Sequence, residues 1–263
     1  MNERAQQLTD KAITGLVEAL ARGESKTLRT YLSTMAKFHR YSWHNCILIW
    51  TQRETATQVA GYGKWKLMGR QVRKGEHVIL ILVPIFERRP KAEDVDKKAS
   101  QEVVAFTAGY VFDIEQTEGE PLPTIGRRSG DPSYHMPRLL QFAEDQGIEV
   151  SFFDDLNGAH GRSKGGKIEV LNKLSSPEQF AVLVHELAHE LLHQGEHKGL
   201  KPKSVRETEA EAVAHVVCEA VGIQNNTATQ DYIQLYQGDT KLLMASLADI
   251  QRASSLILRE VLD

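Results

Sequence analysis

Residues 176–193 read S-P-E-Q-F-A-V-L-V-H-E-L-A-H-E-L-L-H and predict an amphipathic helix. Ser176 and Pro177 are residue types preferred at an N-cap and at the first helical position, and Gln179 completes a capping box. Gly195 supplies a stop signal. The apolar residues that recur at helical spacing are Phe180, Leu183, Val184, Leu187, Ala188, Leu191 and Leu192.

This predicted helix contains the motif H-E-x-x-H. His185 and His189 are one helical turn apart, so both imidazoles lie on one face and can share one tetrahedral zinc ion. Glu186 then projects beside them toward a metal-bound water. The alternative is a chance match on an ordinary amphipathic helix. The clear start and stop of the helix favour a metal site at the edge of the core.

A third metal ligand is expected from the next predicted helix, Ser204–Gly222. At about 100° per residue, Glu207 falls about 50° from the centre of that helix's apolar stripe, and Glu211 about 90°. Glu209 falls more than about 100° away on the other side. Glu207 is therefore the expected ligand, and Glu211 is placed to hydrogen-bond a ligand histidine. A capping box from Ser204 to Glu207 is the alternative.

The remaining histidines are expected not to bind metal. A third histidine of the metzincin type would stand six residues after His189, where this chain has Gly195. His193 is interpreted as a partly exposed helix residue. His197 and His215 are interpreted as non-ligands.

The H-E-L-A-H motif and the segment E-T-E-A-E-A-V-A, which begins 18 residues after His189, resemble the ImmA/IrrE-like metallopeptidases. The resemblance covers roughly Ser133–Gly222. It implies His185, His189 and Glu207 as metal ligands and Glu186 as general base. Many members have Asp or Asn where this chain has Glu211, so the role of Glu211 is less well supported by the resemblance.

Length and composition indicate a soluble globular protein. A chain of 263 residues can form one large or two ordinary domains. We expect a cytoplasmic protein, because no apolar run approaches a membrane span and the N-terminus lacks a signal-peptide pattern. Cys46 and Cys218 are expected to be buried and reduced.

Charge is distributed unevenly between the two halves. Residues 1–128 carry 20 Lys+Arg and 15 Asp+Glu, whereas residues 129–263 carry 12 and 20. The segment Gly61–Gly75 contains five cations, no acidic residue and two aromatic residues, and the segment Arg40–Asn45 again combines a cation with aromatics. Cations beside aromatic rings suit single-stranded nucleic acid, since cations contact phosphates while rings stack on bases. The expected DNA-binding residues are Trp43, Tyr62, Lys64, Trp65, Lys66, Arg70, Arg73 and Lys74. The alternative is a short helix with a solvated basic face and with Trp65 in the core.

Three motifs in order resemble the N-terminal domain of ArdC-type antirestriction proteins. They are S-W-H-N-C-I-L-I-W at 42–50, W-K-x-x-G-R-Q-V-R-K-G-E at 65–76 and V-F-D-x-x-Q-T-E-G at 111–119. The resemblance covers about residues 8–125. It implies a non-sequence-specific single-stranded DNA-binding domain joined to a metallopeptidase-like domain. Members often have Gly-x-x-Pro-Trp after the first helix, where this chain has Gly23 followed by E-S-K-T-L, so part of the DNA surface is expected to differ.

Hydrophobic periodicity and breaker residues predict the other elements. Expected helices are Thr9–Ala21, Thr27–Phe38, Arg40–Trp50, Tyr62–Met68, His135–Gln146, Thr229–Tyr236 and Thr240–Val261. Expected strands are His77–Phe86, Val103–Val111, Ile148–Phe153 and Lys167–Leu171. Glu87–Gln101 is expected to be an exposed loop and Gly158–Gly166 a glycine-rich loop. A domain boundary is placed in the breaker-rich stretch from Pro121 to Pro132.

The sequence thus predicts an α+β protein of two domains. Residues 1–128 are expected to bind single-stranded DNA, and residues 129–263 are expected to form a mainly helical, zincin-like domain with a small sheet. One zinc ion per chain is expected, with manganese or another divalent metal as the alternative. In the expected mechanism, zinc would polarise a peptide carbonyl and Glu186 would transfer a proton from water to the leaving amine. The strand Lys167–Leu171 is expected to hold an extended protein substrate by edge pairing.

Two alternative functions remain open. In the first alternative, the chain acts only by coating single-stranded DNA, and its metal ion has a structural role. In the second, the chain is a regulatory peptidase that cleaves a repressor. No membrane partner is expected.

Overall fold

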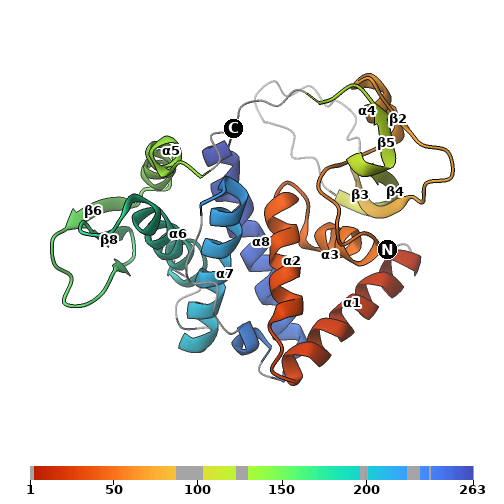
Figure 1. Cartoon of the computed structure of the whole chain (residues 1–263). Coiled ribbons are helices and arrows are strands. Elements are labelled where there is room, and N and C mark those ends of the chain that lie inside the picture. The colour runs from red at the N-terminus through yellow and green to blue at the C-terminus, as the bar shows by residue number, and fades with distance from the viewer. Residues whose placement is uncertain are drawn as a thin grey trace, which may run out of the picture. The chain divides into compact units, whose positions relative to one another are not determined.

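The computed structural model describes residues 3–86, 103–122, 130–195, 199, 201–223, 232–236 and 238–262 (Figure 1). The chain divides into two compact units. We call Met1–Thr14 with His44–Leu122 the strand-rich unit, and Gly15–Trp43 with Pro123–Asp263 the helical unit. Helices and small sheets occur together, which confirms the expected α+β class.

Small antiparallel sheets organise the strand-rich unit. The first has the order β1-β4-β3, in which β4 lies between its two neighbours, and the second pairs β2 with β5. The predicted pairing of β3 with β4 is confirmed, with Leu80 opposite Tyr110. The strands are β1 (Val59–Ala60), β2 (Arg70–Val72), β3 (Ile79–Phe86), β4 (Val103–Asp113) and β5 (Thr117–Gly119). The expected loop Glu87–Gln101 lies outside the described residues.

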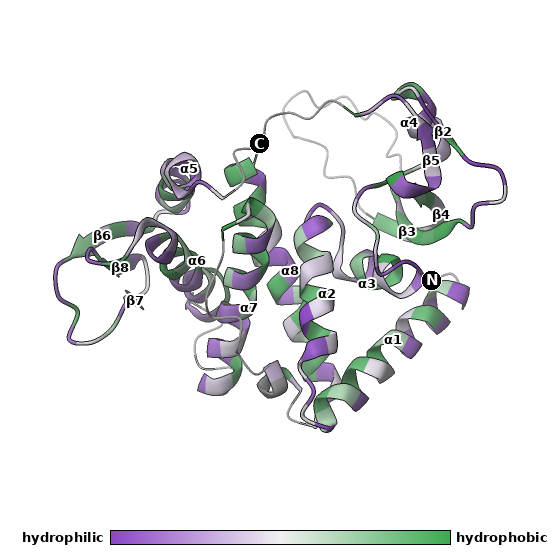
Figure 2. Ribbon diagram, viewed as in Figure 1, coloured by the Kyte–Doolittle hydropathy of each residue, from purple (hydrophilic) through white to green (hydrophobic). Residues whose placement is uncertain are grey.

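Helices complete this unit. Strands β3 and β4 consist largely of hydrophobic residues, whereas α4 is mostly hydrophilic (Figure 2). The helices are the first part of α1 (Glu3–Ala21), α3 (Trp43–Gln52), α4 (Tyr62–Leu67) and the 3₁₀ turn η1 (Ile114–Gln116). α3 begins three residues later than predicted, because residues 38–42 form a turn in which the amide of Tyr41 donates to the carbonyl of Phe38.

Two side-chain amides of α3 satisfy the outer edge of β3. Asn45 donates to the carbonyl of Leu82 and accepts from its amide, at 2.9 and 2.8 Å. Gln52 does the same for Leu80, at 2.9 and 3.0 Å. Asn45 and Gln52 are two turns apart on one helical face, and Leu80 and Leu82 expose their backbone to the same edge of the strand. The asparagine of the S-W-H-N motif therefore has a structural role.

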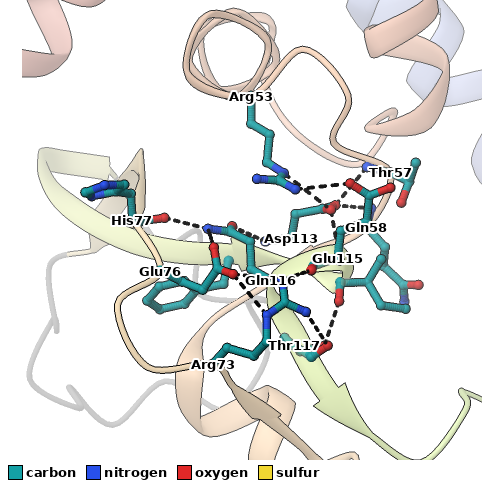
Figure 3. Close-up of polar contacts among 12 residues, drawn as sticks. Arg53, Thr57, Gln58, Arg73, Glu76, His77, Asp113, Glu115, Gln116 and Thr117 are labelled. Atoms are coloured by element: carbon teal, nitrogen blue, oxygen red, sulfur yellow. Dashed lines mark hydrogen bonds and ion pairs between the residues drawn. The ribbon is translucent and has the colours of Figure 1, made fainter.

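A buried polar network forms around Asp113 and Gln116 of the motif at residues 111–119 (Figure 3). The carboxylate of Asp113, fully buried, accepts from the amides of Thr57, Gln58 and Glu115 at 2.8, 3.0 and 3.0 Å. Gln116 accepts from the amide of Asp113 and donates to the carbonyl of His77 and to Glu76. These side chains satisfy backbone groups of three loops. Asp113 and Gln116 therefore stabilise the unit.

The helical unit packs α7 among several helices. α7 (Lys203–Val221) contacts α2 (Lys26–Lys37), α6 (Ser176–His193) and α8 (Thr240–Leu262). It is buried on almost every side, and most of its buried residues are Ala and Val, which allow close helix approach. The assumption of a single apolar stripe on this helix is therefore wrong. The unit also contains α5 (Pro132–Asp145) and the 3₁₀ turn η3 (Tyr232–Leu235).

A three-stranded mixed sheet lies beside α6 in the helical unit. Its order is β6-β8-β7, with β6 (Glu149–Phe153) parallel and β7 (Gly161–Ser163) antiparallel to β8 (Lys167–Leu171). β8 has the predicted bounds. β7 falls inside the stretch Gly158–Gly166 that was expected to be only a loop.

Some expected boundaries differ from the structure. Residues 15–43 pack with the helical unit, so the compact units do not coincide with 1–128 and 129–263. The reason is that α2 uses its buried face, including Leu28 and Met35, in this unit, where α2 contacts α7. Most of the predicted boundary stretch, residues 123–129, lies outside the described residues. Of the predicted helix Thr229–Tyr236, residues 229–231 also lie outside them, and the described part is the 3₁₀ turn η3.

Both cysteines are free and buried, as expected. Burial raises the pKa of the Cys46 thiol above its usual range and that of Cys218 to about 12, so neither is a ready thiolate. Across the described residues, none of the helices has the length and apolarity that a membrane crossing requires.

Candidate functional site

Local capping sets the start of α6. The N-cap is Ser175, whose amide donates to Glu178 at 2.9 Å, so the helix begins one residue before the predicted register. Gln179 does not cap the helix; its side-chain Nε2 instead donates to the carbonyls of Asn172 and Leu174. α6 continues without interruption to His193, which keeps His185 and His189 one turn apart.

Three ligand-type atoms from α6 and α7 converge. Nε2 of His185 and Nε2 of His189 lie 3.1 Å apart, and Oε2 of Glu207 lies 3.6 and 3.4 Å from them. Two ligands about 2.1 Å from one tetrahedral ion are about 3.4 Å apart. The three separations match that value, and both imidazole nitrogens face the same point. The donor set therefore fits a divalent metal ion such as zinc.

The capping alternative for Glu207 does not hold. α7 begins at Lys203 after Pro202, without a side-chain cap hydrogen bond. Glu207 lies in the second turn of α7 and is near both histidines rather than at its own helix terminus.

Glu211 lies on the other side of His185. Its Oε2 is 3.5 Å from Nδ1 of His185, and the Glu211 side chain is buried. A carboxylate in that position favours a proton on Nδ1 and leaves Nε2 free as a ligand. The role of Glu211 as a partner of His185 stays a prediction, for which this contact is the structural basis.

The carboxylates change the electrostatics of His185. Burial alone lowers the pKa of His185, but its contacts with Glu207 and Glu211 outweigh burial and raise the pKa to about 9. The contacts with His185 and His189 hold the pKa of Glu207 far below its usual range.

Glu186 sits beside the three-atom cluster and against strand β7. Its side chain is buried, and burial raises its pKa to about 7, although His185 opposes the shift. A pKa near neutrality suits a group that both accepts and donates a proton. Gly161 of β7 makes room for it, since a Cβ there would lie 2.9 Å from Cγ and Oε1 of Glu186. Sequence reasoning missed this role of Gly161, for which a glycine-rich loop is the only signal.

His193 and Glu209 differ most from expectation. His193 is 2% exposed rather than partly exposed, and Glu209 is fully buried. Nε2 of His193 lies 2.8 Å from Oε2 of Glu209, and Nδ1 of His193 lies 3.0 Å from Nδ1 of His189. Glu209 therefore contacts α6 instead of turning away from it, because α7 is buried on several faces.

The strand expected to bind a substrate edge is not free. β8 is the central strand, with β6 on one side and β7 on the other, so Lys167–Leu171 cannot pair with another chain. The edge beside α6 belongs to β7. Glu190 fixes the following turn, because its carboxylate accepts from Ser163 Oγ and from the amides of Gly165 and Gly166.

Trp65 is in the core of the strand-rich unit and cannot stack on a DNA base. It is fully buried, packs with Ala60 and Val72, and donates from Nε1 to the carbonyl of Phe112 at 2.9 Å. The predicted DNA contact at Trp65 is wrong, and the alternative of a core residue is confirmed.

The cations near Trp65 fall into two groups. Arg70 donates to Thr117 and to the carbonyls of Gly119 and Glu120, while Arg73 pairs with Glu76 and donates to the carbonyl of Glu115. The guanidinium group of Arg70 therefore holds β2 against β5, and that of Arg73 connects the turn after β2 to η1. Lys64, Lys66 and Lys74 are exposed, as is Tyr62 at 55%.

Trp43 belongs to another place in the fold. It lines an open groove of about 420 Å³ in the helical unit, together with Arg40 and Tyr41. Gln251 of α8 donates to the carbonyls of His39 and Tyr41 and so holds this turn against α8. Arg252 and Arg259 of α8 line the same groove. No motif around these two arginines indicated this position.

Comparison with known families identifies the first part of the chain. Residues 2–112 match the family model for the N-terminal domain of anti-restriction factor ArdC. Residues 2–112 are an ArdC N-terminal domain. The resemblance to the ArdC N-terminal domain is thereby confirmed for residues 2–112, which contain the first two of the three motifs.

Solved ArdC structures extend the likeness of fold to the whole chain. The metal-free crystal structure of the antirestriction ArdC protein from plasmid R388 has a TM-score of 0.57, with 16% identity over 98% of both chains. Its Mn(II)-bound crystal structure has the same TM-score, with 15% identity over 97% of this chain and 98% of the other.

An uncharacterized protein from Bacillus anthracis is 24% identical over 275 residues. The match covers 89% of this chain but only 46% of the relative. The chain thus spans about half the length of that protein.

Proposed function

We propose that this chain is an antirestriction-type protein that combines a divalent-metal-dependent peptidase centre with single-stranded DNA binding. The observation that carries the first part is the convergence of His185, His189 and Glu207, whose ligand atoms all lie within 4.8 Å of one another. The Mn(II)-bound structure of a similarly folded ArdC protein supports a divalent metal. Two imidazoles and a carboxylate also suit zinc.

Each residue of the centre has a distinct role. His185, His189 and Glu207 would hold a divalent ion, and Glu211 would orient His185. A divalent cation bound there supplies a Lewis acid that polarises a carbonyl and lowers the pKa of water. Glu186 accepts the proton of the attacking water and returns it to the leaving amine, so one water is consumed as one peptide bond breaks. The edge of β7, rather than β8, is the position for an extended peptide.

DNA binding is supported by a separate observation. The ArdC N-terminal domain exposes Tyr62 beside Lys64 and Lys66, with Lys74 after β2. Exposed cations attract phosphates and an exposed ring can stack on a base. With Trp65 in the core, Tyr62 is the aromatic residue of this surface, and Trp43 with Arg40 forms a second candidate surface in the helical unit.

One experiment separates the peptidase from a pure coating role. Glu186→Gln keeps the shape and all three ligands but removes the general base. We expect the variant to retain its metal and its affinity for a single-stranded oligonucleotide, and to lose hydrolysis of a denatured protein substrate. Protection of DNA from a restriction enzyme is measured in parallel. Full protection by Glu186→Gln, with no hydrolysis by the parent chain, would leave coating as the function.

A further inference from the structure

A series of buried polar groups in contact with one another leads from His189 away from the proposed metal position. Nδ1 of His189 contacts Nδ1 of His193 at 3.0 Å, and Nε2 of His193 contacts Glu209 at 2.8 Å. His193 is 2% exposed and Glu209 is fully buried. A carboxylate in the interior is costly unless it is paired and hydrogen-bonded, so this placement requires partners.

Those partners come from outside α7. Oε1 of Glu209 accepts from Nζ of Lys201 at 2.5 Å, and the same ammonium group contacts Asp249 of α8 at 2.8 Å. Arg252 pairs with Asp249 in turn. Lys201 therefore keeps Glu209 ionised, and the link extends from α6 through α7 to α8.

In this series of hydrogen bonds, the donor and acceptor roles of His189, His193 and Glu209 are fixed by the carboxylate of Glu209. An ionised carboxylate only accepts, so Nε2 of His193 carries a hydrogen. In a neutral His193 the other nitrogen, Nδ1, is then an acceptor. Nδ1 of His189 must therefore donate, which leaves Nε2 of His189 with a lone pair directed at His185 and Glu207.

We infer that His193 and Glu209 are positioning residues that fix the tautomer and the ring orientation of His189 for metal binding. This inference rests on the proposed metal site. It makes the two ligand histidines similar in kind: Glu211 orients His185 directly, and Glu209 orients His189 through an intervening imidazole. Orienting partners of this kind typically contribute about 10- to 100-fold to metal affinity.

The competing explanation is that His193 and Glu209 only hold α6 to α7. That role predicts a loss of stability without a specific change at the metal. The test therefore needs a measurement at the metal itself, together with a folding control on the same metal-free protein.

The experiment uses the full chain and five variants, one of which, His185→Ala, tests the metal site itself. Affinity for Co(II) is measured by chelator competition, the Co(II) visible spectrum reports the ligand geometry, and thermal melting of metal-free protein reports stability. Glu209→Gln and His193→Phe break the chain at successive links. In His193→Asn, the amide oxygen replaces the Nδ1 acceptor. Glu219→Gln, on α7 but paired with His215, is the matched control.

We expect Glu209→Gln and His193→Phe to lower Co(II) affinity by about 10- to 100-fold with an altered spectrum. His193→Asn should recover part of the loss, and Glu219→Gln should behave like the parent. Unchanged affinity and spectrum in Glu209→Gln, with only a lower melting temperature, would overturn the inference. If His193→Phe does not fold, Glu209→Gln and His193→Asn decide the question.

A separate variant, His185→Ala, tests whether the metal ligands themselves are assigned correctly. Undiminished Co(II) binding by His185→Ala would show that the ligand assignment is wrong, and the positioning role would fall with it. Loss of binding in His185→Ala, with no effect in Glu209→Gln, would overturn only the positioning role.

Discussion

A Cβ atom on Gly161 would lie 2.9 Å from both Cγ and Oε1 of Glu186, and 2.6 Å from Cγ1 of Val182. Strand β7 therefore approaches α6 as closely as a residue without a side chain allows. The backbone of Gly161 does not have a positive φ angle, so an alanine side chain there is opposed by lack of space rather than by backbone conformation.

Gly161→Ala should displace Glu186 without removing a metal ligand. We expect the variant to keep its metal content and to lose up to about 100-fold in hydrolysis, because a small displacement of a catalytic group has effects of that size. Metal analysis and peptide hydrolysis are measured on the same sample. Gly15→Ala, where no atom lies within 4 Å of the added carbon, is the control. Equal activity of both variants would contradict the assigned position of Glu186.

The ligand set predicts a graded loss of metal. His185→Ala and His189→Ala should abolish stoichiometric binding, and Glu207→Ala should weaken it, since each removes one of three donors. Glu219→Ala removes a carboxylate from the same helix, away from the site, and should leave the metal content unchanged. Elemental analysis after dialysis measures all four. A Glu207→Ala protein with full metal content would exclude Glu207 as a ligand.

Trp65 should matter for folding rather than for DNA stacking. Trp65→Ala leaves a cavity and an unpaired carbonyl on Phe112, so we expect a loss of about 3–5 kcal/mol in the free energy of unfolding. Tyr62→Ala is exposed and should change that free energy by less than about 0.5 kcal/mol. Denaturant unfolding provides the measurement. A stable Trp65→Ala protein would mean that the ring is not packed as described.

Asp113 should stabilise the strand-rich unit through its backbone contacts. In Asp113→Asn, the new NH₂ group replaces an acceptor that faces the amide of Glu115 and the guanidinium of Arg53. Leaving such donors unpaired costs about 1–3 kcal/mol. Glu118→Gln is the matched control, an exposed acid on the neighbouring strand β5. The prediction fails if the two substitutions lower the unfolding free energy equally.

The cations of the ArdC N-terminal domain should separate by salt dependence and stability. Alanine at Lys64, Lys66 or Lys74 should reduce the salt slope of single-strand binding by about 0.7 for each phosphate that the protein no longer neutralises, without a change in melting temperature. Arg70→Ala should also lower the melting temperature, because Arg70 holds β2 to β5. Oligonucleotide titrations at several salt concentrations test both statements. Lysine variants with an unchanged slope would remove this surface from the DNA interface.

Local sequence patterns were sufficient to predict some of the secondary structure and part of the candidate site. The spacing of His185 and His189 guarantees a shared helical face, because one turn of helix is set by backbone geometry alone. Hydrophobic periodicity likewise predicted β8 with its observed bounds and the β3–β4 pair. The motifs around Asn45 and Asp113 indicated the ArdC domain, although their structural roles were not visible in the sequence.

Packing between distant segments decided the rest. Glu209 faces His193 because α7 is surrounded by α2, α6 and α8, and no single stripe describes a helix buried on several sides. Trp65 packs in a small core with Ala60, Val72 and Phe112, which come from three separate segments of the sequence. Strand order placed β8 in the centre and β7 at the edge. Sequence periodicity specifies which residues share a face of one element, but the identity of the partner face depends on contacts that only the folded chain forms.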